Sequence, residues 1–230
     1  THDIAALIQN QYHITAMAHM TCIAADHEDV DRLAGQLKAS GVENILALRG
    51  DKSEFRAPSK DFAHASDLAA FIRSQYGSFG LSGGCYPECH PEAENLVADI
   101  RNLKRKQEAG VSHLASQLFF DNAKFYRFLN VARKEGIDLP ISAGVMPIVR
   151  KSQIERTVSL SSASLPSEFT RMISRYQDDE AALFEAGIEY AVNQIRDLIE
   201  GGADGIHLYA LNKYEDVAYI AKEAGLLDLI

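Results

Sequence analysis

Apolar runs and amphipathic stretches alternate along the whole chain. Short apolar runs predict buried strands at residues 14–20, 45–48, 79–84, 114–120, 139–145 and 205–209. Apolar residues at helical spacing predict helices at residues 28–39, 65–76, 92–110, 123–135, 167–175, 180–200 and 215–224. Residues 1–9 indicate a helix already under way, and residues 153–158 the start of another. Strand and helix therefore alternate about six times, which is typical of parallel strands joined by right-handed crossovers.

This alternation leaves two architectures open, a doubly wound open sheet and a barrel. The predicted strands have little polar alternation, which suits a sheet covered on both faces. A complete (βα)8 TIM barrel has eight strand–helix units over about 250 residues. Six units fit such a barrel if its first two strands are absent from this chain, and the missing initiator methionine favours that interpretation. No break in composition marks a second domain, so residues 1–230 are predicted to form one incomplete barrel domain.

Composition narrows the function classes. The chain has 32 acidic and 23 basic residues and a net charge of -9, which disfavours a nucleic-acid partner held through phosphates. It has no apolar run of about 18 residues, so no membrane span is expected. With three cysteines and no signal-peptide pattern, a reducing cytoplasm is the predicted location.

Candidate chemistry gathers where the predicted strands end. In parallel α/β folds, ligands bind at the carboxyl ends of strands. Polar or conformationally permissive residues follow each predicted strand here, namely residues 19–22, 49–51, 83–86, 117, 144 and 209–213. If the strands are neighbours, these groups converge on one site.

A second candidate is the predicted helix after Pro91. Asp99, Asn102, Arg105 and Lys106 lie close to one helical face. A carboxylate suits ribose hydroxyls and the two cations suit phosphates, so this face is a candidate nucleotide site. The alternative is an ordinary solvated face. The chain has no GxGxxG or Walker loop, so a nucleotide would be held by another route.

A metal site is the competing interpretation. Cysteine and histidine gather near two strand ends, at His19, Cys22, Cys85, Cys89 and His90. This spacing is a poor match to the paired CxxC motifs of structural zinc, so no metal is predicted, and a metal-dependent barrel hydrolase is the less favoured alternative. His113 and His207 lie in apolar runs and are predicted to be core histidines.

Five short motifs resemble one known family. They are Ala47–Asp51 (ALRGD), the YPExHPEA pattern that ends at Ala93, residues 102–106 (NLKRK), residues 117–121 (QLFFD) and Leu211–Lys213. Together they resemble the methylenetetrahydrofolate reductases, across nearly the whole chain. The resemblance favours the barrel over the open sheet. It also implies FAD as cofactor, and reduction of 5,10-methylenetetrahydrofolate to 5-methyltetrahydrofolate with NAD(P)H as the activity.

The resemblance also implies roles for individual residues. It implies that FAD contacts His19, Leu48, Arg49, Gly50, Asp51, His64, Ala65, Gly84, Tyr86, His90, Ala93, Asp99, Asn102, Arg105 and Lys106. It implies that folate or nicotinamide contacts Asp51, Gln117, Gln153, Leu211 and Lys213. Asp51 matches the carboxylate near the N1–C2 edge of the flavin and the pterin, and is the predicted catalytic residue.

The chain departs from the family pattern in a few places. The proton donor of the family is a glutamate in a Glu-Phe-Phe-Pro-Pro context, and this stretch does not occur here. Thr157 stands where the family has an aromatic residue near the folate ring. These departures keep open a non-catalytic flavin- or folate-binding remnant. The open strand edges of an incomplete barrel also favour a homo-oligomer.

Overall fold

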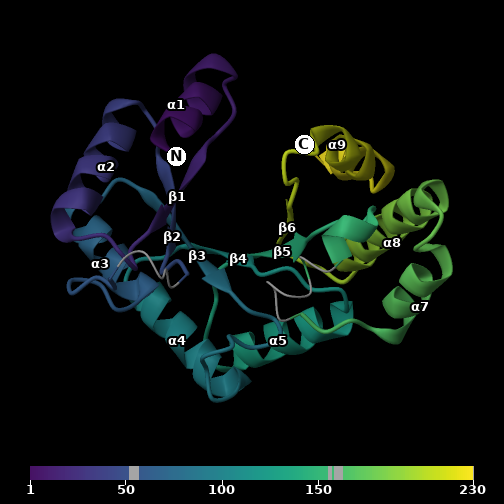
Figure 1. Ribbon diagram of the computed structural model, residues 1–230. Coiled ribbons are helices and arrows are strands. Elements are labelled where there is room, and N and C mark those ends of the chain that lie inside the picture. The colour runs from purple at the N-terminus through teal and green to yellow at the C-terminus, as the bar shows by residue number, and fades with distance from the viewer. Residues whose placement is uncertain (52–56, 155–156, 158–162, 230) are drawn as a thin grey trace. The chain divides into compact units, whose positions relative to one another are not determined.

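The computed structural model describes residues 1–51, 57–154, 157 and 163–229 (Figure 1). Its strands are β1 (Met17–Thr21), β2 (Asn44–Leu48), β3 (Gly80–Cys85), β4 (His113–Ser116), β5 (Ile141–Val145) and β6 (Gly205–Leu208). Its helices are α1 (His2–Gln11), α2 (His27–Ala39), α3 (Ala65–Gln75), α4 (Leu96–Glu108), α5 (Asn122–Lys134), α7 (Ser167–Tyr176), α8 (Glu180–Glu200) and α9 (Tyr214–Glu223), followed by a 3-10 helix at Leu226–Leu229.

The described strands form one sheet in chain order, from β1 to β6. The pairs β1–β2, β2–β3 and β5–β6 are parallel, with Thr21 opposite Leu48 and Val145 opposite Leu208. Neighbouring strands that follow one another in sequence, with helices between them, are the topology of a (βα)8 barrel that lacks some of its strands.

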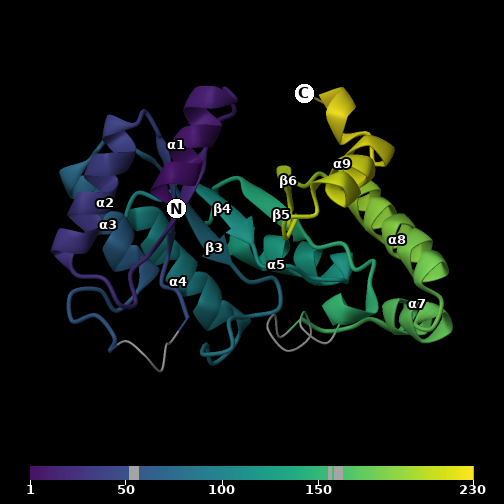
Figure 2. The same cartoon turned by 45° about the horizontal axis from the view of Figure 1, so that its top comes forward.

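The chain divides into two compact units. The first contains residues 1–84, 101–114 and 137–139. Within it, α2 and α3 lie side by side next to the strands (Figures 1 and 2). They bury one apolar stripe each, with Val30 and Leu37 on α2 and Leu68 and Ile72 on α3. This burial holds the carboxyl ends of β1 and β2 in fixed positions.

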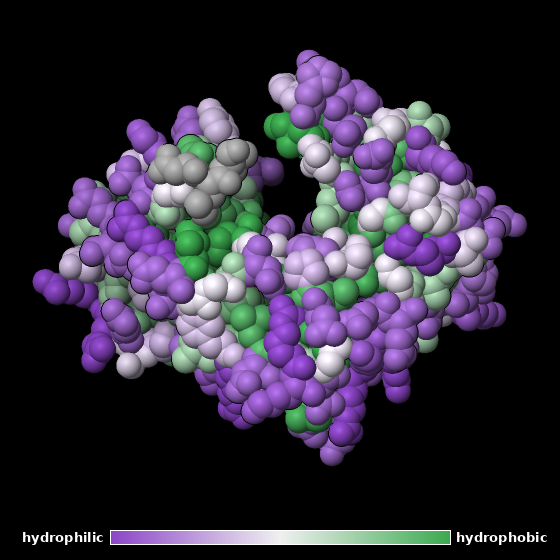
Figure 3. Space-filling view, turned by 180° about the vertical axis from the view of Figure 1, so that it is seen from behind, coloured by the Kyte–Doolittle hydropathy of each residue, from purple (hydrophilic) through white to green (hydrophobic). Residues whose placement is uncertain are grey.

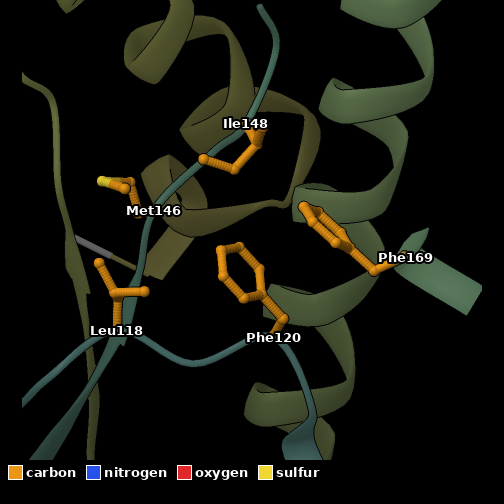
Figure 4. Packing of buried hydrophobic residues seen from close by; sticks show 5 residues of the cluster. All are labelled: Leu118, Phe120, Met146, Ile148 and Phe169. Atoms are coloured by element: carbon orange, nitrogen blue, oxygen red, sulfur yellow. The ribbon is translucent and has the colours of Figure 1, made fainter. Parts of the chain in front are cut away.

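The second unit contains residues 85–100, 115–136 and 140–230. Leu118, Phe120, Met146, Ile148 and Phe169 form a hydrophobic cluster, in which the rings of Phe120 and Phe169 face each other (Figure 4). The Phe120 and Phe169 rings stack with centroids 4.4 Å apart. Because its members come from the segments after β4 and β5 and from α7, the cluster supports the strand ends of this unit.

The strands predicted from residues 14 and 139 begin at Met17 and Ile141, and two other predicted boundaries were wrong by more. The helix predicted from residue 92 begins at Leu96, because the Asn95 side chain accepts the Ala98 amide at 2.9 Å and caps the helix there. The strand predicted over residues 114–120 ends at Ser116. Beyond it, side chains of α8 donate hydrogen bonds to the backbone oxygens: Gln194 to the Phe119 carbonyl at 2.9 Å and Tyr190 to the Phe120 carbonyl at 2.5 Å.

The helix predicted over residues 153–158 is described only in part. Residues 153, 154 and 157 are helical, and residues 155, 156 and 158 lie outside the described residues.

The face in Figure 3 is mainly hydrophilic, with hydrophobic residues exposed in small areas. In the first unit, the exposed large apolar side chains include Ile4, Leu7, Ile14 and Met17, in α1, β1 and the segment between them. Within the described part of the chain, no helix combines the length and apolarity needed to cross a membrane.

Candidate functional site

The end of β2 carries Leu48, Arg49, Gly50 and Asp51. The Arg49 carbonyl accepts the amides of Cys22 at 3.2 Å and Ile23 at 2.8 Å, so this turn is bonded to the end of β1. Gly50 has φ +86°, and a Cβ there would lie 3.0 Å from the Thr21 Cβ. A left-handed backbone without room for a side chain requires glycine. The turn leaves Asp51 exposed directly beyond it.

Two predicted histidines lie near the same strand ends of the first unit. His19 is on β1 opposite Leu46, and partial removal from water lowers its pKa below the ordinary value. His64 is the N-cap residue of α3, where the Asp67 carboxylate accepts its amide at 2.8 Å. The Cys22 thiol points to the His64 carbonyl at 3.7 Å, which links the end of β1 to the start of α3, where Ala65 is buried.

The cationic part of α4 reaches the end of β3. Lys106 donates from Nζ to the Gly84 carbonyl at 2.6 Å. Arg105 lies one turn from Asn102 and donates to its side-chain oxygen at 3.3 Å. Lys106 therefore lies at the end of β3, and the predicted contact of this helix face with a nucleotide stays a prediction.

Asp99, on the same helix, has a structural partner in the second unit. Its side chain is buried, and one carboxylate oxygen accepts the His90 amide at 2.8 Å. The His90 ring packs edge-on against Tyr86 with centroids 4.6 Å apart, and the His90 carbonyl accepts the Ala93 amide at 2.9 Å. Asp99 thus holds the loop that carries three of the predicted flavin contacts. Its predicted contact with ribose stays a prediction.

In the second unit, the side chains of the two predicted glutamines form hydrogen bonds with nearby backbone groups. Gln117 follows β4, and its side-chain oxygen accepts the Leu118 amide at 3.0 Å. Gln153 follows β5, and its oxygen accepts the Val149 amide at 2.9 Å while its nitrogen faces the Pro147 carbonyl at 3.3 Å. Each amide therefore has a defined orientation at a strand end.

Sequence reasoning missed a buried hydrogen-bond network at the ends of β4, β5 and β6. The Tyr209 hydroxyl donates to the Ser116 carbonyl at 3.0 Å, and the Ser116 hydroxyl accepts the Gly144 amide at 2.8 Å. Burial, followed by the nearby Cys85 and Tyr86, raises the pKa of Tyr209 to about 12. The sequence placed Tyr209 and Gly144 at strand ends but contained no signal that Ser116 would join them.

The raised pKa of Tyr209 predicts a loss of stability at high pH. Its neutral form is favoured in the folded state, so the stabilisation is complete below about pH 10 and is lost as the pH rises toward 12, by about 2–3 kcal/mol in all. Tyr209→Phe should cost about 1 kcal/mol at pH 7 and weaken this alkaline loss. Urea unfolding at pH 7, 9.5 and 11 measures both effects. The control is Tyr214→Phe at a 73% exposed side chain, and equal alkaline losses in the two variants would refute the assignment.

The cysteine and histidine residues do not form a metal site in the described part of the chain. No group of three or more His, Cys, Asp or Glu side chains there could hold a metal ion. Burial raises the pKa of Cys22 to about 11, and burial together with Asp99 raises that of Cys89. Metal ligation requires thiolates, so both shifts disfavour it. As predicted for a satisfied histidine, His113 has a partner, the Ser82 hydroxyl at 3.1 Å.

Comparison with known proteins gives the family. Residues 1–225 match the model of a family described as methylenetetrahydrofolate reductase. This chain belongs to that family. The resemblance that the sequence motifs indicated is therefore confirmed.

Relatives of this methylenetetrahydrofolate reductase family member include plant and bacterial proteins. Methylenetetrahydrofolate reductase (NADH) 1 of Arabidopsis thaliana is 33% identical over 242 residues, which cover 99% of this chain and 41% of the plant protein. The 5,10-methylenetetrahydrofolate reductase of Pectobacterium carotovorum is 32% identical over 215 residues, which cover 94% of this chain and 71% of the relative. The chain thus spans less than half the length of the plant relative.

A solved structure supports the fold. An uncharacterised protein from Clostridium thermocellum, which binds two copies of 5-methyl-5,6,7,8-tetrahydrofolic acid, superposes with a TM-score of 0.64 at 13% identity. The match covers 97% of this chain and 78% of that protein. Together with the parallel sheet in chain order, this confirms the predicted fold class, a (βα)8 barrel with strands missing.

Proposed function

We propose that this chain is the part of a flavin-dependent oxidoreductase that reduces 5,10-methylenetetrahydrofolate to 5-methyltetrahydrofolate with NAD(P)H. The observation that carries the proposal is the family match over residues 1–225. Relatives are named for NADH in Arabidopsis thaliana and for NADPH in Caenorhabditis elegans, so the proposal does not choose between the two. A cytoplasmic location and a homo-oligomer remain predictions.

The residues of the first unit fit the phosphates of FAD. Arg49 lies at the end of β2, and Lys106 lies at the end of β3 through its bond to the Gly84 carbonyl. Lysine is a common phosphate-binding residue, and Lys106 places a positive charge at this strand end. Gly50 contributes a left-handed backbone turn that places Arg49 and Asp51 on either side of it.

The residues of the second unit fit the polar groups of a folate or a nicotinamide. Gln117 and Gln153 have fixed amides at two strand ends, and Lys213 offers a cation after β6. Leu211 is 56% exposed at the same strand end and offers an apolar surface. We assign these four residues to substrate binding on this basis and on their match to the family motifs.

Bound FAD would supply the hydride transfer chemistry. The residues of this chain bind and orient the reactants, and the Asp51 carboxylate supplies a negative charge beside them. Opening of methylenetetrahydrofolate to its iminium form calls for a general acid. A flavin- or folate-binding protein without turnover is the second candidate function, because Thr157 stands where the family has an aromatic residue near the folate ring.

Cofactor content and two assays test the proposal. Purified protein should be yellow, take up FAD on titration, and oxidise NADH or NADPH with menadione as acceptor. With methylenetetrahydrofolate as acceptor it should form 5-methyltetrahydrofolate. A colourless protein that takes up no FAD would refute the proposal. Bound FAD with menadione reduction but no methyltetrahydrofolate would instead support the second candidate.

A further inference from the structure

The loops after β5 and β6 lead to three of the four substrate residues proposed for the second unit. The two strands pair in parallel, with Val145 opposite Leu208, so the loops start side by side. The first loop leads into the helical segment that contains Gln153, and the second contains Leu211 and Lys213. The relative position of the two loops therefore sets the distance between the Gln153 amide and the Lys213 ammonium group in the proposed site.

The loop after β6 has an unfavourable backbone conformation. Leu211 and Asn212 have φ angles of 45° and 61°, and the Lys213 amide closes the turn on the Ala210 carbonyl at 2.7 Å. A left-handed conformation is unfavourable for leucine, and such conformations persist where surrounding structure imposes them. Since Leu211 is also exposed, its own packing does not account for the turn, and another contact has to hold it.

An ion pair supplies that contact. Arg150, three residues before Gln153, donates from its two terminal nitrogens to the Asp216 carboxylate at 2.6 and 3.4 Å. Asp216 lies in the first turn of α9, three residues after Lys213, and its side chain is 14% exposed. The guanidinium also lies over the Phe184 ring, 5.8 Å from its centroid. A planar guanidinium that binds both carboxylate oxygens sets direction as well as distance.

We infer that Arg150 and Asp216 are positioning residues that hold the Gln153 turn and the Lys213 turn at the spacing required by a bound folate. The inference rests on the proposed function and adds two residues to it that touch neither cofactor nor substrate. The Gln153 backbone amide donates to the Arg150 carbonyl at 3.0 Å, so movement of Arg150 moves Gln153 directly. Asp216 acts on Lys213 through the first turn of α9.

Three variants test the inference. Arg150→Met and Asp216→Asn should each raise the KM for methylenetetrahydrofolate about tenfold or more, because displacement of binding groups by about an ångström is costly. Their FAD content and flavin absorbance spectrum should equal those of the parent. Exchanging the charges in the double variant R150D/D216R should restore part of the KM, as expected if the two side chains are coupled.

A neighbouring ion pair provides the matched control. Lys151 pairs with Asp178 at 3.4 Å, and both side chains are largely exposed, at 61% and 86%. Lys151→Met removes a cation next to Arg150 but leaves both loops bonded, so its KM should stay that of the parent. Hydrogen exchange of the Lys213 amide gives a readout that is independent of activity. It should speed up in Arg150→Met and stay unchanged in Lys151→Met.

The outcomes separate this inference from the proposed function. A parent protein that reduces folate, with the same KM in Arg150→Met and Lys151→Met, would overturn the inference and leave the proposed function intact. Unchanged exchange of the Lys213 amide in Arg150→Met would overturn it equally. A parent that binds FAD but no folate would refute the proposed function, and the assigned role in folate positioning with it.

Discussion

Asp51→Asn should leave FAD bound, raise the flavin reduction potential by about 30 mV, and slow folate reduction about a hundredfold. Asp51 is exposed at the end of the rigid β2 turn, so the amide should fit without changing the backbone. A carboxylate near the flavin N1–C2 edge disfavours the anionic reduced form, and its removal relieves this repulsion. Dye-equilibrated reduction measures the potential, and methyltetrahydrofolate formation measures the rate.

The control for Asp51→Asn is Asp3→Asn in the same unit, where the carboxylate is 99% exposed and faces His2. Both variants change the net charge by one, so a general charge effect would appear in both. We expect the potential of Asp3→Asn to equal that of the parent. If Asp51→Asn also shows the parent potential while FAD stays bound, then the carboxylate is not near the flavin ring.

Gly144→Ala should destabilise the protein by about 3 kcal/mol. A Cβ at this position on β5 would lie 2.4 Å from the Ser116 carbonyl oxygen and 3.0 Å from the Tyr209 ring. The Ser116 oxygen belongs to the backbone, so a side-chain rotation cannot relieve the overlap. The Tyr209–Ser116 hydrogen bond should be lost at the same time. The free energy of unfolding in urea, followed by circular dichroism, measures the effect.

Gly35→Ala is the matched control for this substitution. Gly35 lies inside α2, and the nearest atom to an added Cβ is the Tyr76 hydroxyl oxygen at an ordinary 3.5 Å. Replacing a helical glycine with alanine should stabilise the protein by about 0.5–1 kcal/mol. Opposite signs for the two variants are therefore expected. A Gly144→Ala variant as stable as the parent would show that β4 and β5 are not packed as described.

The Gln117 region shows why strand lengths were harder to predict than strand order. Residues 114–120 are apolar except for Ser116 and Gln117, and periodicity does not distinguish a buried strand from a buried loop. The loop is stable because Gln194 and Tyr190, which lie 75 and 70 residues from their partners, donate to its carbonyl oxygens. These partners can be identified only in the folded structure. The start of α4 was predicted wrongly for another reason. The prediction used apolar spacing alone, whereas the helix begins where the polar side chain of Asn95 caps it.

The candidate site divides in the same way. Local sequence determined the alternation of strands and helices, the glycine turn after Leu48, the cations of α4 and the family motifs, because each depends on residues close together in the chain. Tertiary structure decided which groups meet: Lys106 with the Gly84 carbonyl, Tyr209 with Ser116, and Arg150 with Asp216, which is 66 residues away. Such pairs depend on where separate strand ends lie in the folded protein. The distances between these residues in space cannot be calculated from their spacing along one sequence.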